Sequence, residues 1–150
     1  EMSEAKKRAE SLHAKNRRQI ISGLEFVSNS ENSDKVEGKG FVIINAKDNI
    51  KETIIGTIAS ILSYSSLYEE GTIIITMAHY NDNTEKIKIS ARTVGKNGRN
   101  IREILNTIII QIGGEVGGHE FAAGAVINKE KEQDFINLLK KNLEIEVVKV

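Results

Sequence analysis

A glycine-rich segment around one histidine contains the residues best suited to hold a phosphate. Residues 113–124 include five glycines and two alanines, with His119 among them. Glycine lets backbone N–H groups approach an anion because no Cβ stands in the way, and successive N–H groups can form an anion-binding concavity. His119 adds a hydrogen bond or, when protonated, a positive charge. Taken alone, Gly117-Gly118-His119 fits a tight helix-to-strand turn with a satisfied polar histidine better than it fits this interpretation.

A run of basic residues precedes this segment. The interval from Lys86 to Arg102 contains no acidic residue. Its basic residues are Lys86, Lys88, Arg92, Lys96, Arg99 and Arg102. The whole chain has 21 basic and 21 acidic residues and no net charge, so the distribution of charge carries the information. Such a run is either a solvated face or a set of phosphate contacts.

Hydrophobic patterning predicts the elements that position these residues. Apolar, β-branched runs predict strands over 41–44 and 72–77, and the alternating residues 85–92 predict a strand that forms a hairpin with the second of these. Alternation places Lys86, Lys88, Ser90 and Arg92 on one face of that strand.

Helical periodicity predicts the remaining core elements. Helices are expected from Asp48 or Asn49 to Tyr64, over 100–112, and from the capping residue Asn128 to Asn142. Residues 113–118 are expected to form a loop, and further strands are expected over 122–127 and 144–150. The predicted fold class is α/β (mixed α+β), with a mixed sheet of about five strands covered by helices.

The chain divides into three parts by composition. Residues 1–28 form an amphipathic helix whose thin apolar stripe needs a partner, either in this chain or outside it. Residues 29–39 are polar and rich in Asn, Ser and Gly, which predicts a loop or linker. Residues 40–150 form the main domain.

Several motifs, in order along the chain, resemble one family. Gly117 to Gly124 reads Gly-Gly-His-x-x-Ala-Ala-Gly and resembles the signature of the DHH-associated C-terminal domain of RecJ-like DHH phosphoesterases. Ser90-Ala91-Arg92 and the Gly-x-x-Ala-x-x-Leu pattern within Ile55 to Leu62 also resemble that domain. Asn16-Arg17-Arg18-Gln19 is similar to the helix that joins the two halves of those enzymes. A related domain closes alanyl-tRNA synthetases, where the glycine cluster lacks this form.

The resemblance implies which residues contact nucleic acid. It implies that Gly117, Gly118 and His119 contact a phosphate and that Arg92 reaches the nucleic-acid backbone, with Ser90 on the same strand face. The remaining expected phosphate contacts are the basic residues Lys88, Lys96, Arg99 and Arg102. Contacts of this kind give salt-dependent and mostly sequence-neutral affinity.

The resemblance also implies that catalysis belongs to a part of the family that this sequence lacks. In the family, an N-terminal half with Asp-His-His and further aspartates holds two divalent metals, Mn or Mg. Here the histidines His13, His79 and His119 are scattered singly, and no Asp-x-Asp or His-x-Asp pair occurs with ligand spacing. We therefore expect no cofactor, no metal site and no catalytic residue, and no enzymatic activity from this chain on its own.

Two functions follow from the resemblance. The first is a non-catalytic module that binds single-stranded DNA or RNA and serves replication or repair together with the GINS and helicase proteins, as short archaeal RecJ-like proteins do. The alternative is the C-terminal substrate-binding fragment of an intact RecJ-like single-strand exonuclease or oligonucleotide phosphodiesterase. The absence of cysteine, of a signal peptide and of a membrane-length apolar run predicts a cytoplasmic protein without a membrane partner. The sequence leaves the oligomeric state open.

Overall fold

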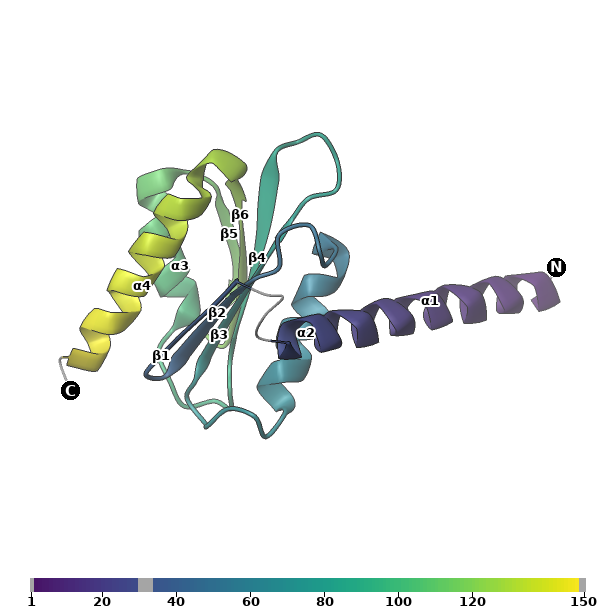
Figure 1. Cartoon of the computed structure of the whole chain (residues 1–150), viewed down its shortest axis with the longest axis horizontal. Coiled ribbons are helices and arrows are strands. Elements are labelled where there is room, and N and C mark those ends of the chain that lie inside the picture. Colours follow the sequence, from purple (N-terminus) through teal and green to yellow (C-terminus); the bar gives the residue numbers. More distant parts are fainter. Residues whose placement is uncertain (1, 30–33, 149–150) are drawn as a thin grey trace.

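A mixed β-sheet with helices on both faces forms the body of the molecule (Figure 1). The computed structural model describes residues 2–29 and 34–148. Within these residues the sheet has six strands in the order β1-β2-β3-β4-β6-β5. The α/β class and the mixed sheet predicted from the sequence are confirmed, with six strands where about five were expected.

The elements follow one another with short connections. They are α1 (Met2–Ser28), β1 (Asp34–Gly38), β2 (Phe41–Asn45), α2 (Glu52–Tyr64), β3 (Ile73–His79), β4 (Lys86–Thr93), α3 (Ile101–Ile112), β5 (Glu115–His119), β6 (Ala122–Asn128), a short 3-10 helix (Lys129–Lys131) and α4 (Glu132–Val148).

Strand pairing combines one parallel step with antiparallel neighbours. β2 and β3 are parallel and are connected through α2, whereas β1–β2, β3–β4, β4–β6 and β5–β6 are antiparallel. The predicted β3–β4 hairpin is therefore confirmed. β6 lies between β4 and β5, so that the last hairpin, β5–β6, forms one edge of the sheet.

Each face of the sheet has its own hydrophobic core. On one face α3 and α4 pack over β2, β3, β4 and β6, with Leu105, Phe135 and Leu139 at the centre. On the other face α2 packs over β2 and β3, with Ile55 and Ile58 fully buried. α2 also contacts β4. On this second face the residues of β6 are half-buried and those of β5 are exposed. A strip of sheet beside α2 is thus open to solvent.

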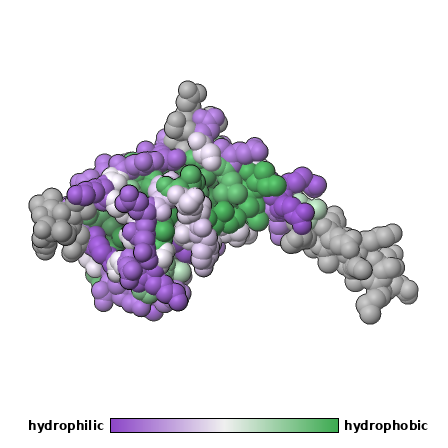
Figure 2. Space-filling view, turned by 90° about the horizontal axis from the view of Figure 1, so that it is seen from below, coloured by the Kyte–Doolittle hydropathy of each residue, from purple (hydrophilic) through white to green (hydrophobic). Residues whose placement is uncertain are grey.

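Helix α1 joins the body only through its last turns. Val27 is buried in the core beneath α2, and Ile20 and Leu24 pack against it. The rest of the helix projects away from the domain (Figure 1). Figure 2 shows hydrophobic surface where α1 meets the body, and Ile21 and Ile61 are exposed hydrophobic residues of α1 and α2. None of the helices in the described part of the chain combines the length and the hydropathy needed to cross a bilayer.

Two segments have a different secondary structure from the one expected. Residues 34–38, placed in the linker by composition, form β1, an edge strand held to β2 by backbone pairing with little burial. Residues 144–148, expected to begin a strand, continue α4. The spacing of Phe135, Leu139 and Leu143, all buried, keeps the helix face on the core. Residues 149–150 lie outside the described residues.

Two predicted helix caps are also wrong. α2 begins after Lys51 without a side-chain cap, because Asp48 lies against His79 and the Asn49 amide donates to the carbonyl of Ala46. Asn128 makes no capping bond with its side chain, because a 3-10 turn precedes α4. In contrast, Asn100 caps α3 by accepting a hydrogen bond from the backbone N–H of Glu103 at 3.1 Å.

Candidate nucleic-acid interface

The open strip of the sheet is organised in three rows that cross β4, β6 and β5. Strand register aligns residues of these strands side by side, and alternate residues share a face. From β4 to β5 the rows are Arg92–Ala122–His119, Ser90–Gly124–Gly117 and Lys88–Val126–Glu115. All nine lie on the face that carries α2, because the intervening residues Ala91, Ala123 and Ala125 are buried against α3 and α4.

The middle row has almost no side-chain volume. A Cβ built on Gly117 would meet no atom within 4 Å, so this position faces open space. Ser90 is only 3% exposed and lies beneath Gly56 of α2, where an added Cβ would come within 3.3 Å of the serine hydroxyl. Gly124 and Gly117 therefore form a shallow floor between the taller rows on either side, and Ser90 continues this row beneath α2.

Arg92 borders this floor, and hydrogen bonds to neighbouring residues hold its guanidinium in place. Its Nε donates to the Ser60 hydroxyl at 3.1 Å, and its Nη1 donates to the carbonyls of Ala91 at 2.8 Å and Ala123 at 3.5 Å. Nη2 has no acceptor within the described residues. Burial lowers the pKa of Arg92, and the phenol of Tyr64 opposes this shift. The side chain remains a cation with one nitrogen available to a ligand.

His119 stands at the other end of the same row, at the edge of the sheet. Its Nδ1 accepts a long hydrogen bond, 3.4 Å, from the backbone N–H of Phe121. With Nδ1 accepting, the neutral ring carries its proton on Nε2, which is a donor for a phosphate oxygen. A cavity of about 530 Å³ adjoins this side chain at the strand edge, and it is otherwise lined mainly by Asn100, Arg102, Glu103 and Asn106 at the start of α3.

The hairpin that carries His119 is tied to its surroundings. The carbonyls of Glu120 and Phe121, at the turn, accept hydrogen bonds from the N–H groups of Ile101 and Thr93, both at 3.0 Å. Arg102 of α3 donates to the carbonyl of Gly118 at 2.9 Å. The position of His119 relative to β4 is thereby set by two backbone hydrogen bonds and by one from the Arg102 side chain.

Gly117-Gly118-His119 is not the anion-binding loop expected from the sequence. The three residues belong to β5 and pair with Gly124, Ala123 and Ala122 of β6. Their N–H groups follow the geometry of a strand and do not converge into a concavity. The two glycines have different roles: Gly117 leaves space on the open face, whereas Gly118 has φ +101° and an added Cβ would collide with Ala122 and Ala123.

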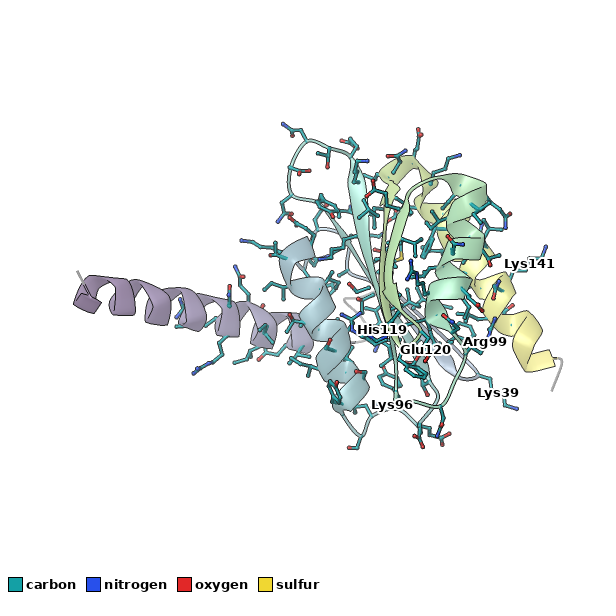
Figure 3. All side chains as sticks on the ribbon, turned by 180° about the vertical axis from the view of Figure 1, so that it is seen from behind. Lys39, Lys96, Arg99, His119, Glu120 and Lys141 are labelled. Carbon is teal, nitrogen blue, oxygen red and sulfur yellow. The ribbon has the colours of Figure 1, made fainter. Side chains whose placement is uncertain are left out.

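The basic run divides between the two sides of the sheet. Lys88 and Arg92 lie on the open face. Lys96 is exposed in the loop after β4, and Figure 3 shows it toward the same end of the sheet as His119. Arg99 instead donates to the Oδ1 of Asn142 at 2.7 Å and to the carbonyl of Asn142 at 3.4 Å, and it lies with α3 and α4. Arg99 and Arg102, expected at the phosphate site, both make hydrogen bonds within the domain, and Arg102 is exposed beside the cavity that His119 lines.

Three helix residues that border the open face were not predicted as site residues. Gly56, Ser60 and Tyr64 recur every fourth residue on α2, and such residues lie on one side of a helix. Gly56 and Ser60 lie against Arg92. The spacing of small residues on α2 was a signal for close approach to the sheet, but it did not indicate which strand residue they approach.

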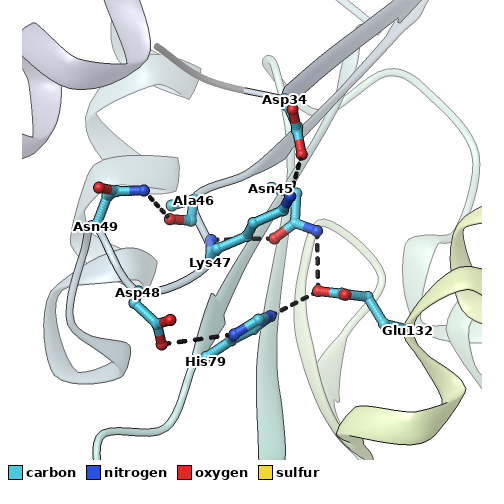
Figure 4. Close-up of polar contacts among 8 residues, drawn as sticks. All are labelled: Asp34, Asn45, Ala46, Lys47, Asp48, Asn49, His79 and Glu132. Carbon is cyan, nitrogen blue, oxygen red and sulfur yellow. Dashed lines mark hydrogen bonds and ion pairs between the residues drawn. The ribbon is translucent and has the colours of Figure 1, made fainter.

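A second polar cluster lies at the ends of β2 and β3 (Figure 4). His79 is 6% exposed, and its Nε2 lies 2.6 Å from a carboxylate oxygen of Glu132 at the start of α4. The amide of Asn45 donates to the same carboxylate at 3.0 Å, while Asp48 is 3.5 Å from Nδ1 of His79. Burial raises the pKa of Glu132, but the hydrogen bonds from His79 and Asn45 and the nearby charges of His79 and Lys47 outweigh it, and the pKa is lowered overall.

This cluster attaches α4 to the sheet. Three elements, β2, β3 and α4, meet at Glu132. In the described part of the chain, no group of three or more His, Cys, Asp or Glu side chains is placed to hold a metal ion. His79 links β3 to α4 through its contact with Glu132. The side chain of His13 lies outside the described side chains.

Residues 38–144 match the family described as the DHHA1 domain, which is more than half of the chain. This chain belongs to the DHHA1 domain family. The DHHA1 domain is an accessory domain of DHH phosphoesterases, and the match covers this accessory domain alone. No curated protein matches the sequence.

Solved structures of DHHA1-like fold are similar to this one. A DHH-domain protein described as a member of a family of ribosomal proteins has a TM-score of 0.53 and 17% identity over 89% of this chain and 31% of its own. The C-Ala domain of alanyl-tRNA synthetase from Aquifex aeolicus has a TM-score of 0.55 and 14% identity over 72% of this chain and 96% of its own. CDC45 from Entamoeba histolytica has a TM-score of 0.61 and 9% identity over 85% of this chain and 27% of its own.

These likenesses establish a shared fold. The chain spans about a third of the DHH-domain protein and about a quarter of CDC45, while it spans nearly the whole C-Ala domain. The same sheet and helices therefore occur both as one part of longer proteins and as the whole of a domain crystallised alone.

Proposed function

We propose that the open face of β4, β6 and β5 binds the sugar–phosphate backbone of single-stranded nucleic acid, DNA in the first instance. The observation that carries this proposal is the pair of donors at the ends of one row, Nη2 of Arg92 and Nε2 of His119, beside the glycine floor. Both lie within the DHHA1 match.

The dimensions of the face favour one extended strand. Arg92 and His119 are separated by β6 alone, which is two strand spacings or about 10 Å. Ala122 lies between them and rises little above the backbone. A phosphate placed over Ala122 would have a cationic donor on one side and an imidazole on the other, and the glycine floor would leave room for the adjoining sugar.

The charge on the face is modest, and this sets the expected affinity. The positive charges of Lys88 and Arg92 are opposed by Glu115, which ends the row that begins with Lys88. Arg99 and Arg102 contact this domain's own carbonyl groups. We therefore expect few phosphate contacts and a correspondingly shallow salt dependence, of about two to four released ions per bound strand.

Binding of a fluorescently labelled 12-nucleotide single strand tests the proposal. Anisotropy titrations at several salt concentrations measure Kd and its salt slope for the wild type and for the double variant Arg92→Ala with His119→Ala. The double variant is expected to bind at least about tenfold more weakly and to have a shallower slope. Lys141→Ala is the matched control, because Lys141 is exposed on α4 away from this face. Equal affinity of the double variant and the wild type rules out this face.

A second candidate role is the substrate-holding part of a DHH phosphoesterase. It is favoured by the coverage of only 31% of the DHH-domain protein, in which a DHHA1-like domain is one part of a longer chain. In that role the same face presents the strand to a metal-containing DHH half. We expect the chain alone to release no nucleotide from a labelled oligonucleotide in the presence of Mn²⁺ or Mg²⁺, and measurable release would locate catalytic groups in this chain.

We also propose that this chain associates with GINS and helicase proteins, as the resemblance to short RecJ-like proteins implies. Such an assembly would place the open face beside single-stranded DNA. Size-exclusion chromatography of the chain mixed with purified GINS tests it, and separate elution of the two components at micromolar concentration would remove this part of the proposal.

A further inference from the structure

The edge of α2 that borders the open face ends in an exposed aromatic residue. Gly56, Ser60 and Tyr64 succeed one another by one helical turn, and the first two lie against Arg92. An added Cβ at Gly56 would lie 3.8 Å from Nη2 of Arg92. Tyr64 continues this edge beyond the guanidinium.

The exposure of Tyr64 is unusual for the helix that carries it. Its side chain is 90% exposed at the last residue of α2, while Ile55, Ile58 and Leu62 of the same helix are buried. The Tyr64 hydroxyl partly opposes the lowering of the Arg92 pKa by burial. Single-stranded nucleic acids stack their bases on exposed aromatic rings that border a cationic groove, and Tyr64 lies one helical turn beyond Ser60, the partner of the Arg92 cation.

We propose that Tyr64 stacks on a nucleobase of the strand whose phosphate lies between Arg92 and His119. This inference rests on the proposed function and deepens it by assigning a base contact to a face that otherwise contacts only backbone. The ligand is then a strand that carries bases, since a phosphate chain without bases uses only part of the site. Stacking is tolerant of sequence because every base has a π-face.

Substitution of Tyr64 together with removal of bases tests the inference. Single strands of 12 nucleotides, one with normal bases and one with abasic sites throughout its central six positions, are titrated by anisotropy against the wild type, Tyr64→Ala and Tyr64→Phe. We expect Tyr64→Ala to weaken binding of the normal strand about tenfold and Tyr64→Phe to stay within about twofold of the wild type. The abasic strand is expected to bind the wild type and Tyr64→Ala alike.

A neighbouring exposed residue supplies the matched control. Leu67 is 70% exposed just beyond α2, so Leu67→Ala removes a comparable apolar surface without removing a ring. It is expected to leave both titrations unchanged. Equal losses from Leu67→Ala and Tyr64→Ala would indicate a general apolar contact and overturn the stacking assignment.

A strand containing 2-aminopurine separates failure of this inference from failure of the proposed function. Stacking on Tyr64 quenches 2-aminopurine at one position, and Tyr64→Ala removes that quenching. If Arg92→Ala weakens binding but Tyr64→Ala changes neither affinity nor quenching, phosphate binding stands and the base contact is wrong. If neither strand binds the wild type at all, the proposed function falls and the base contact falls with it.

Discussion

The Nε atom of Arg92 donates a hydrogen bond of 3.1 Å to the hydroxyl of Ser60, which joins β4 to α2 at the border of the open face. The two residues are far apart in sequence, and the bond requires α2 to lie close to the strand. Gly56, one turn earlier, permits this approach because a side chain there would press on Ser90. The guanidinium is consequently oriented before any ligand arrives.

Ser60→Ala is expected to weaken oligonucleotide binding by about three- to tenfold, because Arg92 loses the partner that orients it. The same change is expected to lower the free energy of unfolding by about 0.5–1.5 kcal/mol. Thr57→Ala, an exposed position of the same helix, is the control and should alter neither quantity. Anisotropy and urea unfolding measure the two effects, and an unchanged Kd for Ser60→Ala would show that ligand binding does not need this bond.

The two central glycines are expected to respond in opposite ways. Gly117→Val places a side chain in open space on the floor, so it should fold normally and bind oligonucleotide at least about tenfold more weakly. Gly118→Ala should lower the free energy of unfolding by about 1–3 kcal/mol, because φ is +101° and the new Cβ meets Ala122 and Ala123. Thermal unfolding and anisotropy separate the two effects. Normal affinity of the Gly117 variant would place the ligand elsewhere.

Arg99 is expected to act on stability and not on binding. Arg99→Ala removes the hydrogen bonds to the carbonyl and side chain of Asn142, which should lower the free energy of unfolding by about 1–3 kcal/mol. Its Kd for the labelled strand should remain within about twofold of the wild type after correction for the folded fraction. A large loss of affinity in the folded protein would indicate that Arg99 contacts a phosphate of the ligand.

Glu132 is expected to make the domain sensitive to acid. Its pKa is lowered in the folded protein, so the carboxylate stabilises the fold fully above its ordinary value of 4.5 and this contribution is lost as the pH falls through the lower folded value. Glu132→Gln should therefore be less stable than the wild type at pH 7, and the difference should shrink below about pH 4.5. Urea unfolding from pH 7 to pH 3 measures this.

Glu130→Gln is the control for the acid series, because Glu130 is exposed in the turn before α4. It should show the same pH dependence as the wild type. Parallel curves for Glu132→Gln and the wild type across this range would mean that the contacts with His79 and Asn45 do not favour the charged form.

The central part of the fold follows from local patterns, and its edges do not. β2, β3 and β4 were predicted because strands buried on both faces, or on one, must carry β-branched apolar residues at fixed spacing. β1 and β5 are edge strands in which Val36 and Val116 are the main apolar residues. Pairing with one neighbour through the backbone stabilises such strands without a hydrophobic pattern, and a composition-based reading assigns them to loops.

Residues 144–148 show the opposite case, because their local pattern predicts a strand that does not form. Ile145 and Val147 alternate with Glu144 and Glu146 as in a strand, yet α4 continues through them. The anchor residues Phe135, Leu139 and Leu143 fix the helix on α3 and the sheet, and a helix once anchored extends into residues whose own preference is weak. The packing of the earlier turns of α4, and not the local sequence pattern, therefore determines the secondary structure of this segment.

The arrangement of the proposed site residues was predicted in part. Alternation along β4 correctly placed Lys88, Ser90 and Arg92 on one face, because a strand has a period of two. No local rule indicates where the chain goes after β4, and there residues 94–102 carry Arg99 and Arg102 to the side of α3 and α4. The juxtaposition of Arg92 with His119 depends on the insertion of β6 between them, which only the completed sheet specifies.

β6, the strand beneath the proposed ligand, is paired along both of its edges, with β4 and with β5. The backbone of the floor therefore has little conformational freedom left to lose when a single nucleic-acid strand binds. The entropic cost of association would fall on the nucleic acid and on a few rim side chains. A ligand that is already extended and stiff would then have an advantage over a flexible one carrying the same charges.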